Sequence, residues 1–235
     1  MSERFFCEQP ITGDTAQLAG SEAHHLLHVM RAKPGDAITL FDGSGAEFDA
    51  EVAASTRSTV DARVLARRDV DRERPRPLVL GVALPKGDRQ KYLVEKLTEL
   101  GVTRLVPLVT ERSVAKLSGG ALDKLRRGVI EASKQCGRNV LMTIDEPVPF
   151  EAALTLAPPT ASRRIAHPGE GADQPAADST AGGATEAWRL IGPEGGFSDT
   201  EVAAAEAAGW SRLSLGRTIL RIETSAVAIA AREDW

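Results

Sequence analysis

The hydrophobic pattern changes near residue 72, and this change limits the fold more than any other feature. Before it, apolar and polar residues alternate in short segments such as Glu47–Val52 and Val60–Leu65, and Ala37–Phe41 is a further strand candidate. Such alternation is typical of strands with one buried face. After it, Leu78–Leu84 is a continuous apolar run, as expected of a strand buried on both faces. The charged segment Asp69–Pro77, which contains two prolines, is predicted to be a linker.

The second part of the chain alternates predicted strands and helices. A helix is predicted from Asp88 to Leu100, because Leu93, Leu97 and Leu100 share one face and Gly101 follows as a C-cap. A second helix is predicted over 121–136, and strands over 105–109, 140–144, 163–166, 188–191 and 213–215. This order predicts an α/β domain with a mainly parallel sheet over residues 73–235, after a small β-barrel domain over residues 1–72.

The C-terminal third contains a low-complexity segment and then two further helix signals. Residues 169–186 are rich in Ala, Gly, Asp and Thr and are predicted to be a surface insertion. Ser198 and Glu201 have the spacing of a capping box and predict a helix start. The closing helix is predicted over Glu223–Arg232.

Charge is distributed unevenly along the 235 residues. The formal net charge is −4, yet residues 76–142 carry 13 basic and 6 acidic side chains. A basic middle between acidic flanks fits a face that binds a polyanion such as RNA, although it also fits ordinary solvated helix surfaces.

Several protein classes are excluded by what the sequence lacks. No run approaches the roughly 20 apolar residues of a membrane span. Two cysteines, Cys7 and Cys136, cannot build a disulfide framework or a Cys-rich zinc site, so a reducing cytoplasm is expected. His24 and His28 share a helix face but lack accompanying ligands, and no metal is expected. The phosphate-binding loop of P-loop NTPases is also missing.

The candidate site centres on the run Gly192-Pro193-Glu194-Gly195-Gly196, between a predicted strand and a predicted helix. Two adjacent glycines let a ligand approach the backbone, and the carboxyl end of a strand in an α/β sheet is the usual ligand site. An ordinary strand–helix turn would explain a bare glycine pair equally well.

Two further polar motifs accompany this loop. In Leu215–Ser225, Arg217, Arg221 and Glu223 flank an apolar pair, and Glu223 is placed to meet the positive end of a helix dipole. Glu131–Arg138 is a polar helix end with a terminal cation. Both motifs are also compatible with simple capping and surface charge.

Six runs in order along the chain resemble the ribosomal RNA small subunit methyltransferase E family of the SPOUT superfamily. The matching runs are His25–Asp36, Pro85–Val102, Glu111–Val114, Glu131–Arg138, Ile191–Ser198 and Leu213–Ser225. The resemblance implies a PUA-like RNA-binding β-barrel followed by a knotted SPOUT α/β domain with a deep trefoil knot. It also implies S-adenosylmethionine (SAM) as cofactor, a homodimer, and methylation of uracil N3 at one position of 16S rRNA in the small ribosomal subunit.

The resemblance also assigns expected roles to residues of this chain. Arg138 and Arg221 would orient the RNA and stabilise negative charge on the base, and Glu194 and Glu223 are the carboxylates expected nearest the chemistry. The expected cofactor-binding residues are Leu190, Ile191, Gly192, Pro193, Glu194, Gly195, Gly196, Leu215, Gly216, Ile219 and Leu220. The expected RNA phosphate contacts are Arg31, Lys33, Lys86, Arg89, Lys91 and Arg112.

Departures from the family pattern leave alternatives open. Ser225 stands where the family usually has alanine, and Asn139–Met142 lacks a proline that often follows the Gln…Arg motif. The insertion at 169–186 makes a cofactor role for His167–Gly171 doubtful. The alternatives are a SPOUT methyltransferase acting on another rRNA or tRNA position, and a non-catalytic RNA-binding protein of the same fold.

Overall fold

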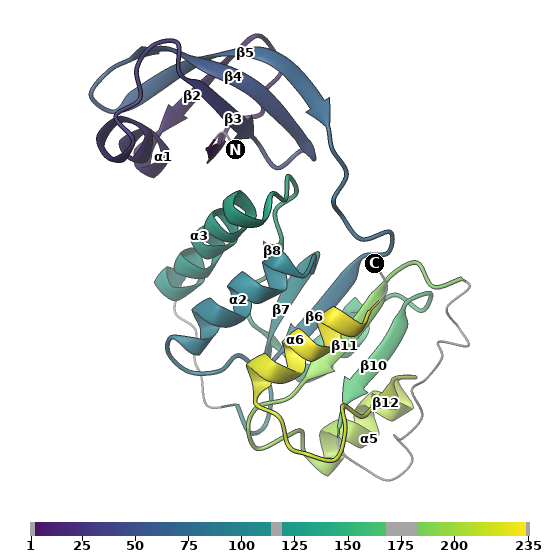
Figure 1. Cartoon of the computed structure of the whole chain (residues 1–235). Helices are drawn as coiled ribbons and strands as arrows, with labels where there is room; N and C mark the ends of the chain where they lie inside the picture. Colours follow the sequence, from purple (N-terminus) through teal and green to yellow (C-terminus); the bar gives the residue numbers. More distant parts are fainter. Residues whose placement is uncertain (1–2, 114–118, 168–182, 234–235) are drawn as a thin grey trace. The chain divides into compact units, whose positions relative to one another are not determined.

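A computed structural model describes residues 3–113, 119–167 and 183–233 of the chain (Figure 1). The chain divides into two compact units, one made of residues 1–73 and 130–141 and the other of residues 74–129 and 142–235. Most of the predicted insertion at 169–186 lies outside the described residues, as does Val114.

The first unit contains a five-stranded sheet in the order β1-β3-β4-β5-β2. Its strands are β1 (Arg4–Phe6), β2 (Thr15–Ala19), β3 (Ala37–Phe41), β4 (Ala46–Ser55) and β5 (Thr59–Asp69). Only the β1–β3 pair is parallel. Helix α1 (Gly20–His24) is followed directly by a π-helical turn, η1 (His25–Val29).

Irregular pairing and one-sided burial explain the shape of this sheet. The register of β4 against β5 shifts at Asp49/Ala50 and again between Val52 and Ala54. Such bulges bend a strand and increase its twist, so the sheet curls around its apolar face (Figure 1). Phe5, Leu40 and Phe48 lie in the core that this curl encloses.

The second unit contains a parallel sheet in the order β12-β10-β11-β6-β7-β8, with β9 paired to β7. The strands are β6 (Leu78–Val82), β7 (Arg104–Val109), β8 (Thr143–Ile144), β9 (Val148–Pro149), β10 (Ser162–Ala166), β11 (Ala187–Ile191) and β12 (Ser211–Leu213). The helices are α2 (Arg89–Glu99), α3 (Gly119–Cys136, whose last turns belong to the first unit), α4 (Phe150–Leu156), α5 (Asp199–Ala207) and α6 (Ile222–Arg232). The predicted α/β class and mainly parallel sheet are confirmed.

Two buried features hold this sheet and its helices together. A Cβ atom at Gly81 in β6 would lie 2.5 Å from Leu190 Cδ2 of the neighbouring strand β11, so the missing side chain gives Leu190 its place in the core. Helices α2 and α6 lie side by side (Figure 1), and the buried Arg74 guanidinium binds the C-terminal ends of both. It donates hydrogen bonds to the carbonyl oxygens of Leu100, Ala230 and Glu233. These carbonyl groups end the two helices and have no partner within them.

Two strand predictions were misplaced. The strand predicted at 140–144 is only Thr143–Ile144, because Val140 and Leu141 pack in the first unit against the turn that contains Gly43 and Gly45. The strand predicted at 213–215 is Ser211–Leu213, since Leu213 ends its pairing with β10. Strands β1, β2 and β9 and helix α4 were not predicted.

Candidate functional site

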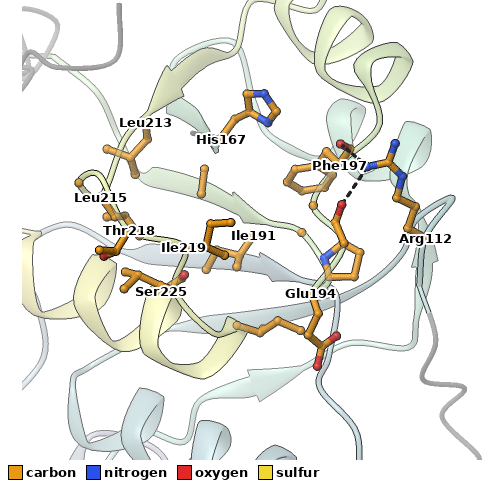
Figure 2. A pocket seen from close by; sticks show the side chains of 18 of the residues that line it. Arg112, His167, Ile191, Glu194, Phe197, Leu213, Leu215, Thr218, Ile219 and Ser225 are labelled. Carbon is orange, nitrogen blue, oxygen red and sulfur yellow. Dashed lines mark hydrogen bonds between the residues drawn. The ribbon is translucent and has the colours of Figure 1, made fainter. Parts of the chain in front are cut away.

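A cavity of about 310 Å³ opens at the carboxyl ends of β10, β11 and β12 (Figure 2). Because these strands are parallel, the residues that follow them meet at one edge of the sheet, which is where ligands bind in α/β folds. Its walls come from the ends of β10 and β12, the loop after β11, residues 215–220 and the first turn of α6.

The loop after β11 is held in shape by backbone contacts. The Gly196 amide donates to the Pro193 carbonyl at 2.8 Å, which closes a tight turn with Gly196 at φ 71°. A Cβ atom at Gly192 would lie 3.0 Å from the Phe197 amide nitrogen, so a side chain at this position would push against the loop backbone. The buried Phe197 ring packs on Phe150 with ring centroids 5.2 Å apart and anchors the end of the loop in the core.

The predicted capping box starts α5 directly after this loop. Ser198 Oγ accepts from the Glu201 amide, and one Glu201 carboxylate oxygen accepts from the Ser198 amide. The other Glu201 oxygen accepts from the Glu111 amide at 2.9 Å. One buried carboxylate therefore joins the loop after β7 to the start of α5.

Arg112, in the loop after β7, also binds the loop after β11. Its Nη1 donates to the Gly195 carbonyl at 2.8 Å and more weakly to the Phe197 carbonyl at 3.5 Å, as Figure 2 shows. This guanidinium was predicted to contact RNA phosphate. In the structure it lines the cavity and fixes the backbone of the cavity wall.

Ten of the eleven residues expected to bind the cofactor line this one cavity. They are Ile191, Gly192, Pro193, Glu194, Gly195, Gly196, Leu215, Gly216, Ile219 and Leu220. Leu190 does not line it, because alternation along β11 turns its side chain into the core. The remaining lining residues, besides Arg112, were not named as cofactor contacts: Ala166, His167, Phe197, Asp199, Leu213, Thr218, Ile222 and Ser225. The position of Ala166 and Leu213 at the ends of parallel strands could have identified them.

The four residues that were predicted to take part in catalysis lie in different surroundings. Glu194 lines the cavity, whereas Glu223 is buried in the first turn of α6. Arg221 is exposed at the N-cap of α6, between the lining residues Leu220 and Ile222. Arg138 belongs to the first unit, where its guanidinium forms a buried, two-pronged ion pair with Glu73.

The basic residues expected to contact phosphate also divide into two groups. Arg31, Lys33, Lys86 and Lys91 are exposed, as phosphate contacts need to be. Arg31 has φ 58°, a left-handed conformation that is uncommon for a residue with a side chain and often occurs at functional positions. Arg89, at the start of α2, instead faces two carboxylates, Glu194 and Glu223.

Two further observations concern membrane-spanning helices and metal sites. No helix among the described residues has the length and apolarity to cross a membrane. The rings of His24 and His28 lie 4.8 Å apart, and within residues 3–113, 119–167 and 183–233 no three His, Cys, Asp or Glu side chains group as metal ligands would.

Replacing Arg112 by methionine is expected to weaken binding of SAM, the cofactor that the resemblance implies, about tenfold, which is the effect of losing one charge-assisted hydrogen bond that orders the cavity wall. Calorimetric titration with SAM measures this change. Arg127, an exposed arginine of α3, provides the matched control, and Arg127→Met is expected to bind SAM normally. Unchanged SAM affinity in Arg112→Met, together with weaker RNA binding, would show that Arg112 contacts RNA phosphate and does not order the cavity wall for SAM.

Comparison with known proteins identifies the family. Residues 72–232 match the RNA methyltransferase domain family, and residues 18–65 match the RNA methyltransferase PUA domain. The ribosomal RNA small subunit methyltransferase E of Synechocystis sp. is 34% identical over 95% of this chain and 72% of its own length. The protein of that name from Mycobacterium tuberculosis is 33% identical over 94% of this chain and 87% of its own.

Solved structures agree with these sequence matches. The ribosomal RNA small subunit methyltransferase E of Neisseria gonorrhoeae, solved with bound SAM, superposes with a TM-score of 0.90 at 29% identity and covers 98% of this chain and 96% of its own. A methyltransferase from Legionella pneumophila with bound SAM gives a TM-score of 0.86 at 30% identity, with the same coverage. The chain belongs to the ribosomal RNA small subunit methyltransferase E family.

Proposed function

We propose that this chain transfers the methyl group of SAM to N3 of one uridine in 16S rRNA. The general activity, SAM-dependent rRNA methylation, follows from membership of the family. The observation that carries the proposal is the cavity at the carboxyl edge of the parallel sheet, which gathers ten of the residues that the resemblance assigns to the cofactor. The choice of N3 rests on the resemblance of the six sequence runs.

The lining of the cavity fits SAM chemically. Ile191, Leu213, Leu215 and Leu220 give apolar walls for an adenine ring and an aliphatic chain, and the loop backbones supply polar groups. A Cβ atom at Gly196 or Gly216 would meet no other atom within 4 Å, so each glycine leaves space at the wall. When bound, SAM supplies a methyl group on a positively charged sulfur atom.

The residues of the chain would hold the two reactants in line and exclude water from the reacting atoms. Arg221, exposed beside the cavity wall, is proposed to bind the RNA and to offset negative charge as N3 loses its proton. The same role for Arg138 stays a prediction, and in this structure its guanidinium is bound to Glu73. Arg31, Lys33, Lys86 and Lys91 are proposed to contact phosphates.

The larger assembly is also a proposal. The homodimer rests on the resemblance of the six sequence runs, and Ile219, an apolar cavity-lining side chain that is 89% exposed, is proposed to be covered by the second copy. Light scattering of the purified protein measures the dimer directly. We further propose that 1–72 and 73–235 act as separate domains, that the second is knotted, and that the enzyme works in the cytoplasm.

Deletion of the gene is expected to remove one N3-methyluridine from 16S rRNA. N3 methylation blocks Watson–Crick pairing, so primer extension along 16S rRNA should lose a single stop. The wild-type gene should restore the stop, and a Gly196→Trp gene should not. A stop that persists without the gene contradicts the assignment. A methyl group missing from another rRNA or a tRNA would favour a different SPOUT target, and a protein that releases no heat with SAM would favour the non-catalytic RNA-binding protein.

A further inference from the structure

Three charged side chains from three separate elements meet beside the cavity. Arg89 begins α2, Glu194 lies in the loop after β11, and Glu223 lies in the first turn of α6. Arg89 Nη2 is 3.2 Å from Glu194 Oε1, and Arg89 Nη1 is 4.0 Å from Glu223 Oε1. We call these three residues the Arg89 bridge. The bridge thus places one basic side chain between two acidic ones.

Burial differs across the bridge and separates the roles of its two carboxylates. The Glu223 side chain is 9% exposed, and its Oε2 is inaccessible and has no hydrogen-bond partner among the described residues. Glu194 is 44% exposed and lines the cavity. Only Glu194 can therefore be reached by an incoming base without rearrangement of the protein.

The direction of the Glu194 side chain suits contact with an RNA base. Figure 2 shows its carboxylate pointing away from His167 and Leu213, at the other side of the cavity. The Glu194 carboxylate therefore does not fill the space between His167 and Leu213. Arg89 contacts Oε1, which leaves the second oxygen of Glu194 available as an acceptor.

We propose that Glu194 accepts the N3 proton of the target uracil, and that Arg89 and Glu223 are positioning residues that hold Glu194 in place. This inference rests on the proposed function. In the step, the N3–H bond breaks and its proton passes to a Glu194 oxygen. The electron pair left on N3 forms the bond to the methyl carbon, and the carbon–sulfur bond breaks with its electron pair kept by sulfur. Glu194 then releases the proton to water through its exposed side.

Arg89 is the residue through which the buried Glu223 carboxylate influences the position of Glu194. Glu223 is confined by burial at the start of α6, so its charge attracts the Arg89 guanidinium to one side. The guanidinium then limits the orientations of Glu194, whose side chain is 44% exposed. A general base needs a fixed position within hydrogen-bond reach of its proton, and the bridge would supply it. The contact of Arg89 with RNA phosphate stays a prediction.

The decisive experiment measures single-turnover methylation of 16S rRNA in the small subunit by wild type and Glu194→Gln as pH is raised. At neutral pH the variant is expected to be about 10²- to 10⁴-fold slower, the usual range for loss of a general base. Its rate should recover as pH rises, because N3–H is a weak acid that ionises without help in alkaline solution. RNA with 5-fluorouridine at the target, whose N3–H is more acidic, should also reduce the difference between variant and wild type.

Further variants separate the positioning roles from the proton acceptor. Arg89→Met and Glu223→Gln are expected to be about tenfold slower with unchanged SAM affinity, and Arg89→Lys should recover part of the rate. Glu206→Gln is the matched control, because Glu206 is 43% exposed and paired with an arginine, Arg212, at 2.7 Å but lies outside the bridge. Its rate should equal that of wild type.

The outcomes distinguish the inference from the proposed function. If wild type binds no SAM or forms no N3-methyluridine, the proposed function itself fails. If wild type forms N3-methyluridine but Glu194→Gln stays within twofold of its rate, or is slowed equally at every pH and with 5-fluorouridine, the assignment of Glu194 is overturned. Calorimetry with SAM on each variant checks that the cavity is intact.

Discussion

Replacing Arg74 by methionine is expected to lower the free energy of unfolding by about 3 kcal/mol, as is typical when a buried charged hydrogen-bonding group is removed. The guanidinium donates to the carbonyl oxygens of Leu100 and Glu233, and to that of Ala230, so it satisfies the ends of α2 and α6 together. Methionine keeps the apolar stem and leaves these oxygens without their donors. A lysine should give a smaller loss, because it keeps the charge near both helix ends but has fewer donors.

Urea unfolding followed by circular dichroism measures this loss. Arg67→Met is the control, because the pair between Arg67 and Asp69 is exposed, and such pairs contribute at most about 1 kcal/mol. A value for Arg74→Met within 1 kcal/mol of wild type would show that the two helix ends find other donors.

A tryptophan at Gly196 is expected to weaken SAM binding by at least about 100-fold, or roughly 2.7 kcal/mol. Gly196 lines the cavity, and a Cβ atom there would meet no atom within 4 Å, so a large side chain has space only by occupying the ligand volume. The positive φ of 71° adds strain for any side chain. Calorimetric titration with SAM is again the measurement.

The control for this variant must carry the same strain without blocking the cavity. Gly20 has φ 58° and also has no atom within 4 Å of an added Cβ, but it starts α1 in the first unit and does not line the cavity. Gly20→Trp is therefore expected to bind SAM as wild type does. Equal affinity of Gly196→Trp and wild type would place the ligand elsewhere.

The sequence was sufficient to predict the features that depend on local pattern. The continuous apolar run at Leu78 and the leucine spacing from Leu93 to Leu100 predicted a buried strand and an amphipathic helix, and both are present. The capping box at Ser198 was also predicted and is present. Each of these depends on neighbours within a few residues of the chain.

Features that depend on distant contacts could not be predicted. Val140 reads as a strand residue by its neighbours, yet its packing partner is the turn near Gly45, almost a hundred positions earlier. Arg89 and Arg112 read as phosphate contacts by their charge, but carboxylates and carbonyl groups from the end of the chain face them. Composition identifies a cation, whereas only the fold decides which anion or acceptor is within reach.

The Glu201 carboxylate links the loop after β7 to the start of α5. This link has a consequence for how the protein responds when a ligand occupies the cavity. One carboxylate oxygen of Glu201 accepts from the Ser198 amide at the start of α5 and the other accepts from the Glu111 amide, while Arg112 donates to the Gly195 carbonyl. The loop after β7 and the loop after β11 that leads into α5 are thus joined by hydrogen bonds from both backbone and side-chain groups. A ligand that rigidifies one of these segments would also rigidify the other. The mobility of residues that do not contact the ligand would therefore fall when it binds.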